Sequence, residues 1–261
     1  MTAAQPNILA RVIARRLVTL SPADGGGGGF FRQTPVTPPK SRLNRGLEWF
    51  TKRLNLPRER FDELAERERK HAFTVAGVAQ LDLIQQVKEA LASAVAEGKT
   101  LEEFKDEVGA SLEAEWKGTV ANPGARLETI FRTNVQSAYN AGKHHAATEP
   151  DALERRPYWQ FVAALDNRTT NICRPLNGKV IKADDPFWND HTPPLHFNCR
   201  STIRPLTEEQ AKQRGIATGD EIPARVSAEG FGRPPGQPTD LLAGRDPSLA
   251  GIVRQKIEAN Q

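Results

Sequence analysis

Four side chains that bind soft metal ions lie close together in the second half of the sequence. They are Cys173, His191, His196 and Cys199, and the 261-residue chain has no other cysteine. Thiolates and imidazoles hold tetrahedral zinc, and the spacing of His196 and Cys199 lets one tight turn present two ligands. The pattern predicts a structural zinc site. Alternatively, the cysteines are small buried hydrophobic residues and the histidines hydrogen-bond to the backbone around a turn formed by two consecutive prolines.

A second set of residues in the same stretch can fasten loops together. Asp166, followed by Arg168 and Thr169, is typical of an Asx turn at the end of a strand. Its carboxylate can then form an ion pair with Arg200, which would hold the small domain together. The alternative is that Asp166 and Arg200 are unrelated surface charges. Gly178 is predicted to supply a positive φ in a later turn.

The elements that must position these residues follow from the spacing of apolar residues. A repeat every three or four positions predicts helices over most of 41–116, including the run 75–91, and another from about 125 to 145. Gly98 is expected to end one helix, and a capping box starting at Thr100 is expected to begin the next. These helices should pack as an antiparallel bundle.

After the helical region the period changes to two. Tyr158 to Ala164 is a short aromatic and β-branched run that predicts a strand, and 179–181 and 201–204 predict two more. The strands would form a small antiparallel sheet with long loops. Phe187 and Trp188 are expected to cover its apolar side.

The predicted fold class is α+β, with a helical bundle followed by a small antiparallel β module and flexible extensions at both ends. The chain divides into a mobile basic helix with a Gly/Pro linker (1–40), a helical region (41–150), the β module with its signature residues (151–210), and a Gly/Pro-rich tail with a terminal helix (211–261).

Charge is distributed unevenly along the chain. The formal net charge is +4, but residues 1–60 contain eleven Lys or Arg and three Asp or Glu. A basic arm on a slightly acidic body favours contact with DNA or with an acidic partner protein, unless the arm is simply solvated. Trp49, Phe50 and Lys52 between arginines would also suit a nucleic-acid-binding module. No apolar run approaches the roughly 18 residues that cross a membrane, so a cytoplasmic protein without membrane contact is expected.

The sharpest enzymatic alternative is a metal-dependent nuclease of the HNH type. Asp190-His191 and Asn198 could act as a base and an orienting amide, but this chemistry also needs a metal-binding histidine on a following helix. A strand without histidine is predicted there instead. Walker, Gly-x-Ser-x-Gly and His-Glu-x-x-His motifs are missing from the sequence, which favours a protein that is not an enzyme and has no small-molecule substrate. His144-His145 is expected to cap a helix end as a cation.

Several short motifs occur in an order that resembles a known family. They are Arg132-Thr133-Asn134, Tyr139-Asn140-Ala141-Gly142, Tyr158-Trp159, Asp166-Asn167-Arg168-Thr169, Asn177-Gly178, Asp185-Pro186-Phe187-Trp188, Pro193-Pro194 and Asn198-Cys199-Arg200. In this order the segment resembles the phage Mu F-like family of head-morphogenesis, or minor capsid, proteins. Residues 1–60 and 215–261 lie outside the resemblance.

The resemblance implies a structural minor head protein that acts in capsid assembly near the portal. Its partners would be portal and capsid proteins and, through the basic N-terminal region, DNA. It would be found in the host cytoplasm during assembly and then in the virion head. Two residues depart from the family pattern: members often have histidine at Cys173 and a second cysteine at Ser201. The first exchange keeps metal-binding chemistry, whereas the second removes a ligand that His196 would have to replace.

Overall fold

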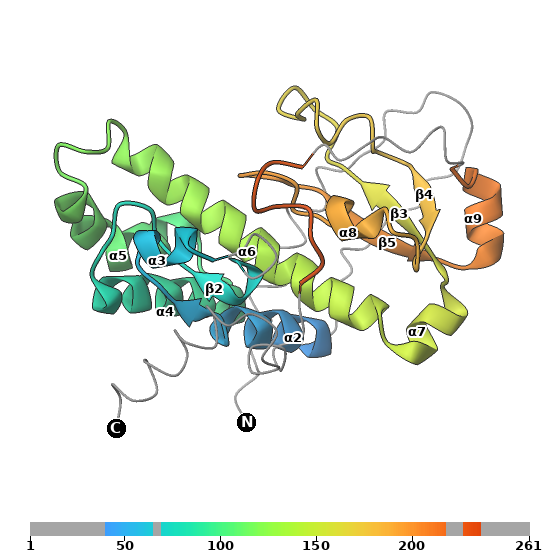
Figure 1. Ribbon diagram of the computed structural model, residues 1–261, viewed down its shortest axis with the longest axis horizontal. Helices are drawn as coiled ribbons and strands as arrows, with labels where there is room; N and C mark the ends of the chain where they lie inside the picture. The colour runs from blue at the N-terminus through green and yellow to red at the C-terminus, as the bar shows by residue number, and fades with distance from the viewer. Residues whose placement is uncertain (1–39, 65–68, 218–226, 236–261) are drawn as a thin grey trace, which may run out of the picture.

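The computed structural model describes residues 40–64, 69–217 and 227–235 (Figure 1). The helices predicted near residues 7–20 and 249–259 lie outside these residues. The described chain has the predicted α+β fold, with helices on one side and a three-stranded antiparallel sheet on the other. Among the described helices, none combines the length and the apolar character that a membrane crossing requires.

The elements follow one another in a simple order. They are α2 (Lys40–Thr51), β1 (Leu54–Asn55), α3 (Arg58–Asp62), η1 (Arg69–His71), β2 (Ala72–Phe73), α4 (Leu81–Glu97), α5 (Leu101–Glu115), α6 (Pro123–Ala147), α7 (Pro150–Arg155), β3 (Tyr158–Val162), β4 (Val180–Lys182), α8 (Trp188–His191), β5 (Thr202–Leu206) and α9 (Glu208–Arg214). The boundary between α4 and α5 is as predicted: Gly98 adopts a left-handed φ of 77°, and Thr100 and Glu103 form a capping box.

The helix expected over the apolar run 75–91 is shorter than predicted, because α4 begins only at Leu81. Gly77 has a φ of +76°, and the indole of Trp116 packs closely against it. The same indole donates a hydrogen bond to the Ala76 carbonyl at 3.2 Å. Val75 is nevertheless buried. Apolar spacing therefore identified buried positions correctly, but the left-handed glycine gives these residues a non-helical path.

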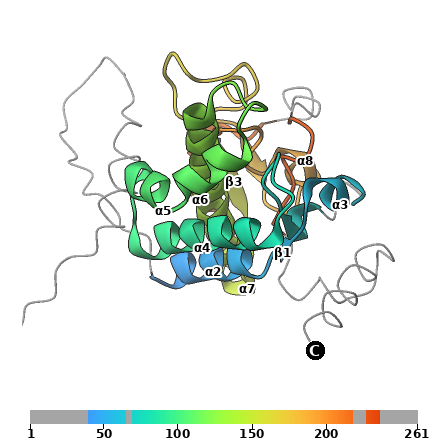
Figure 2. The ribbon, with the colours of Figure 1, turned by 90° about the vertical axis from the view of Figure 1, so that its left-hand side faces the viewer.

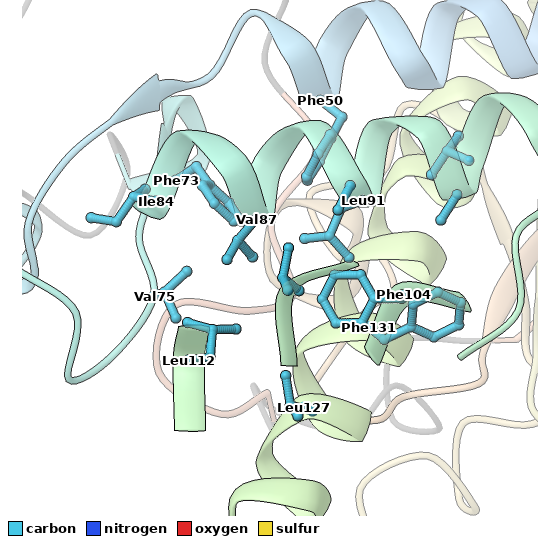
Figure 3. Packing of buried hydrophobic residues seen from close by; sticks show 14 of the residues in the cluster. Phe50, Phe73, Val75, Ile84, Val87, Leu91, Phe104, Leu112, Leu127 and Phe131 are labelled. Carbon is cyan, nitrogen blue, oxygen red and sulfur yellow. The ribbon is translucent and has the colours of Figure 1, made fainter. Parts of the chain in front are cut away.

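The main core lies between α2, α4, α5 and α6 (Figures 2 and 3). Figure 2 shows α2 and α4 layered beneath α6. Phe104 of α5 and Phe131 of α6 meet with ring centroids 5.4 Å apart, and Leu91 of α4 is fully buried beside them. Burying side chains of this size is the dominant source of stability for such a bundle.

Two aromatic residues considered for nucleic-acid contact belong to this core instead. Trp49 is 8% exposed and Phe50 is fully buried, and Phe50 packs edge-on against Phe73. The Arg53 guanidinium lies 5.1 Å from the Trp49 ring centroid and donates to the Ala72 carbonyl at 2.7 Å. Trp49 and Phe50 therefore do not support the alternative of a nucleic-acid-binding module, because protein covers both side chains.

Helices α2 and α6 cross at very close range, and two glycines make this approach possible. A Cβ atom on Gly142 would overlap the Arg42 carbonyl oxygen and would lie 2.9 Å from the Gly46 nitrogen. A Cβ atom on Gly46 would overlap the Ala138 carbonyl oxygen. The obstructing atoms are backbone, so they cannot rotate away as a side chain would.

Gly142→Ala is expected to lower the free energy of unfolding by about 1 to 3 kcal/mol, because α2 and α6 must move apart to admit the methyl group. Chemical denaturation measures this change. Gly124→Ala is the matched control at the start of α6, where the nearest atom to an added Cβ is 3.7 Å away. The control should be neutral or stabilising by up to roughly 1 kcal/mol. Equal effects of both substitutions would contradict a close crossing.

The sheet has the order β4-β3-β5, with antiparallel pairing on both sides of β3. The predicted alternation in β3 is present. Trp159 and Phe161 face one core, which also contains Trp188, whereas Tyr158 faces a smaller cluster beside α9. The strands predicted at 179–181 and 201–204 are present as β4 and β5, and each begins one residue later than predicted.

The predicted flexible tail beyond residue 211 contains ordered contacts where it is described. The Thr192 N–H donates to the Gly232 carbonyl at 2.7 Å, and the Ala228 N–H donates to the Leu195 carbonyl at 2.9 Å. The Phe231 ring lies 4.9 Å from that of Phe197. Residues 227–235 therefore pack on the loop that precedes β5.

The end of α6 joins the bundle to the sheet. His144 is buried, and its ring lies edge-on against Trp159 with centroids 5.4 Å apart. Burial, together with repulsion from His145 and Lys70, lowers the pKa of His144 to about 4. The expectation of a cationic helix cap was therefore wrong for His144, because desolvation outweighs the favourable helix dipole.

Acidification should destabilise the fold through His144. Because folding lowers the pKa of His144, the contribution of this residue to folding stability is complete above the unfolded-state pKa of 6.5. This contribution is lost as the pH falls toward 4. Between pH 7.5 and 4.5 the loss from this residue is expected to be about 2 to 3 kcal/mol. His144→Phe keeps a ring against Trp159 without a titrating group, so its unfolding free energy should fall less over this range. Parallel pH profiles for the two proteins would contradict this expectation.

Candidate functional site

Two long loops carry most of the predicted site residues. One loop joins β3 to β4 through residues 163–179, and the other joins α8 to β5 through residues 192–201. Gly178 turns the first loop into β4 with the predicted positive φ, here 86°. Such loops cannot satisfy their own polar groups by strand pairing, so other contacts must hold them.

The predicted ion pair between Asp166 and Arg200 is confirmed and joins the two loops. The two terminal nitrogens of the Arg200 guanidinium, Nη1 and Nη2, each donate to one carboxylate oxygen of Asp166 at 2.6 Å. The Arg168 N–H donates to Asp166 Oδ1 at 2.8 Å, and this bond makes the predicted Asx turn. The Asp166 N–H also donates to Thr169 Oγ1 at 2.8 Å. Hydrogen bonds from Arg200 hold the pKa of Asp166 well below its usual range. The carboxylate therefore remains charged as a clamp.

Three of the four predicted metal ligands meet beside this clamp. The ligand atoms of Cys173, His196 and Cys199 all lie within 4.8 Å of one another. Cys173 Sγ is 3.2 Å from His196 Nε2 and 3.7 Å from Cys199 Sγ. Both cysteines are buried as free thiols, and His196 is half-buried. This cluster, like the ion pair, connects the β3–β4 loop to the loop before β5.

The environment of the cluster favours one thiolate. Hydrogen bonds from Cys173 and His196 and from the N–H groups of Leu195 and Ser201 lower the pKa of Cys199, in opposition to burial. The hydrogen bond to Cys199 raises the pKa of Cys173. The same thiolate raises the pKa of His196. The cluster can thus hold negative charge on sulfur next to an imidazole.

His191 does not join this group. Its ring stacks on Phe187 with centroids 4.1 Å apart, and its Nδ1 lies 2.9 Å from the Phe187 carbonyl oxygen. Asn198, its partner in the nuclease hypothesis, points to α6: its N–H donates to Thr133 Oγ1 at 3.0 Å and its Nδ2 to Thr129 Oγ1 at 3.2 Å. His191 therefore packs against Phe187, whereas Asn198 anchors its loop to α6.

The remaining signature residues have structural contacts. Trp188 is buried, lies 5.3 Å from the Trp159 ring and donates its Nε1–H to the Lys182 carbonyl at 3.0 Å. It covers the apolar side of the sheet, as predicted. Arg132 forms an ion pair with Glu128 one turn away on α6.

Sequence reasoning missed how the loop before β5 is anchored. Asn140 of α6 donates to the Ser201 carbonyl at 3.0 Å, and Gln136 of α6 donates to the same oxygen at 3.4 Å. Thr170 Oγ1 also lies 3.0 Å from His196 Nε2. A usable signal was that Asn140 lies close to the small residues Ala138, Ala141 and Gly142 in α6, which are buried with it.

The fold and site together define a structural α+β module in which polar and sulfur-containing side chains hold two loops together. The family described as Phage Mu protein F like protein matches residues 85–204, from within α4 to within β5. This segment is therefore similar to the Mu F-like family, as its signature residues predicted.

Two curated relatives come from a phage and a prophage. The chain is 33% identical over 170 residues to the putative capsid assembly protein F of Escherichia phage Mu, covering 60% of this chain and 38% of that protein. It is 31% identical over 164 residues to the Mu-like prophage FluMu F protein of Haemophilus influenzae, covering 59% and 39%. The chain thus spans about two-fifths of the length of these relatives. No solved structure matches this chain.

Asp166→Ala is expected to loosen both loops and to leave the helical core unchanged. Amide hydrogen exchange in residues 163–178 and 192–200 should become faster by roughly two- to fivefold, the scale of a partly exposed ion pair. Mass spectrometry of proteolytic fragments measures this change. Asp184→Ala is the matched control, because its pair with Lys182 spans only two residues and joins no loops. Unchanged exchange in both loops would show that the pair is not a clamp.

Proposed function

We propose that this chain is a structural minor head protein of a tailed phage or prophage and that it acts in head assembly without catalysing a reaction. The observation that carries the proposal is the match of residues 85–204 to the Mu F-like family, whose relative in phage Mu is named a putative capsid assembly protein. The site is consistent with this role, because Asp166 and Arg200 are occupied with each other and both cysteines are buried.

The place of action that the family resemblance implies is the portal region of the head. Portal and capsid proteins are then the partners. The chain would assemble in the host cytoplasm and end in the virion head. A rigid module suits this role, since a protein that fits between other proteins gains affinity when its surface is already ordered.

Deletion of the gene from its phage or prophage is expected to reduce DNA-filled heads and infectious particles by orders of magnitude. Supplying the chain in trans should restore both. Electron microscopy and plaque counts measure the outcome, and cosedimentation with purified portal and capsid proteins tests the partners. A normal yield of DNA-filled heads without the gene would contradict the proposal.

The structural proposal and the nuclease alternative make opposite predictions for a substitution of Asn198. Asn198 has a φ of 58°, so Asn198→Gly keeps the backbone accessible while removing the side-chain amide. Head assembly should survive this substitution nearly unchanged. Loss of a DNA-cleaving activity of the purified chain in the same variant would favour the enzyme instead.

A second candidate role, contact with DNA, is favoured by a group of cations at the junction of α2, α6 and the sheet. Arg42, Tyr139 and Lys143 line a small pocket, and Lys143 Nζ lies 5.7 Å from the Tyr139 ring centroid. Burial, with repulsion from Arg42 and Arg204, lowers the pKa of Lys143 to about 7. Within the described residues, no carboxylate ion pair balances Arg42, Lys143 or Arg204. A bound phosphate would relieve this repulsion.

Arg42→Gln and Lys143→Met are expected to weaken DNA binding and to make it less sensitive to salt. The slope of log affinity against log salt should decrease by about 1 for each phosphate contact that is lost. Fluorescence titration of a labelled duplex at several salt concentrations measures the slope. Lys105→Gln is the control, because Lys105 is half-buried and already paired with Glu102 at 2.9 Å. Identical slopes in all four proteins would exclude this surface as a DNA contact.

A further inference from the structure

The cluster of Cys173, His196 and Cys199 stands apart from the other polar groups of the molecule. Within the parts of the chain that the structure describes, it is the one group of three or more His, Cys, Asp or Glu side chains found with converging ligand atoms. Its three atoms come from two loops, and Cys173 is 23 residues from His196 in the sequence. Ordinary packing of two small thiols does not require an imidazole nitrogen to point at them.

The distances within the cluster match a tetrahedral metal site. Zinc–sulfur bonds of about 2.3 Å place two sulfurs about 3.8 Å apart in a tetrahedron, and a sulfur and a nitrogen about 3.6 Å apart. The observed separations are 3.7 Å between Cys173 Sγ and Cys199 Sγ and 3.2 Å between Cys173 Sγ and His196 Nε2. These two separations are within about 0.4 Å of the tetrahedral values, and the His196 and Cys199 ligand atoms lie within 4.8 Å of each other, so side-chain adjustment would bring all three within reach of one ion.

The surroundings also resemble the outer shell of a metal site. His196 Nδ1 lies 2.7 Å from the Phe197 carbonyl oxygen, so an N–H there would leave Nε2 free to bind a metal. The left-handed residue Asn198 provides the tight turn between His196 and Cys199.

Two hydroxyl groups flank the fourth position. The Ser201 side chain hydrogen-bonds to the Cys173 sulfur, and Thr170 Oγ1 lies 3.0 Å from His196 Nε2. Oxygen is an accepted zinc ligand, either from a side chain or from water. His191, the fourth ligand predicted from the sequence, is turned toward Phe187 and has no part in this arrangement.

We infer that Cys173, His196 and Cys199 bind one zinc ion, with an oxygen ligand in the fourth position, and that the ion cross-links the β3–β4 loop to the loop before β5. The ion and the Asp166–Arg200 pair then fasten the same two loops at neighbouring points. A structural zinc contributes directly to folding free energy, which is valuable for a sheet of only three strands.

The inference is tested on the full chain, purified under reducing and anaerobic conditions. Elemental analysis should find about one zinc per chain, and cobalt should give the absorption bands of a tetrahedral thiolate site. Cys199→Ser and His196→Asn should retain less than about a tenth of the metal. His191→Gln should retain all of it. A folded, reduced wild-type chain that binds neither zinc nor cobalt would overturn the inference.

A variant that gains a metal ligand separates loss of the site from misfolding, because misfolding cannot raise metal affinity. Ser201 is buried with its hydroxyl at the Cys173 sulfur, so Ser201→Cys places a third thiolate at the fourth position. Cobalt affinity should rise by at least roughly tenfold, the scale at which even outer-shell changes act. Circular dichroism checks the fold of each variant. An unchanged affinity in folded Ser201→Cys would contradict the geometry, and a metal-free chain two hydrogens lighter would identify a Cys173–Cys199 disulfide instead.

Discussion

A single helix has to serve two cores, and the rest of the structure depends on it. The 25 residues of α6 extend about 38 Å, long enough to cross the bundle and reach the sheet. Leu127 and Phe131 pack in the helical core, whereas Ala147 belongs to the core of the sheet. Gly142, between these sets, allows α2 to approach the helix backbone. Because one rigid element takes part in both cores, bundle and sheet are held in a fixed relation.

The sheet side of the molecule faces a different constraint. Three short strands bury few side chains, and the loops between them are long. Strong local cross-links replace a large core under such conditions. The Asp166–Arg200 pair and the Cys173–His196–Cys199 cluster both join the β3–β4 loop to the loop before β5. Asn140 then anchors the second loop to α6, so the loops, the sheet and the bundle form one connected unit.

The need to hold two long loops together explains why many signature residues of the segment are polar. Charged and sulfur-containing side chains in loops usually suggest catalysis, but here they are satisfied by one another or by backbone groups. Among the described residues, Arg42 and Lys143 form no ion pair with a carboxylate, and they lie elsewhere, where α2 meets α6. The contacts that hold the two loops together thus lie apart from this pair of cations.

The sequence alone predicted the features that depend on neighbouring residues. The α+β class, the capping box at Thr100, the positive φ of Gly178 and the Asx turn at Asp166 all follow from local chemistry and were confirmed. The ion pair to Arg200 could also be predicted, because both residues flank strands of the same small sheet.

Only the tertiary structure decided which distant groups meet. Spacing could not distinguish His191 from the three residues that cluster, because a histidine is oriented by what packs against its ring. Periodicity placed Val75 in the core but not in a helix, since burial and backbone conformation are separate properties. Burial likewise made His144 neutral and removed Trp49 from the surface. These outcomes depend on solvent exclusion by residues far along the chain, which no local pattern encodes.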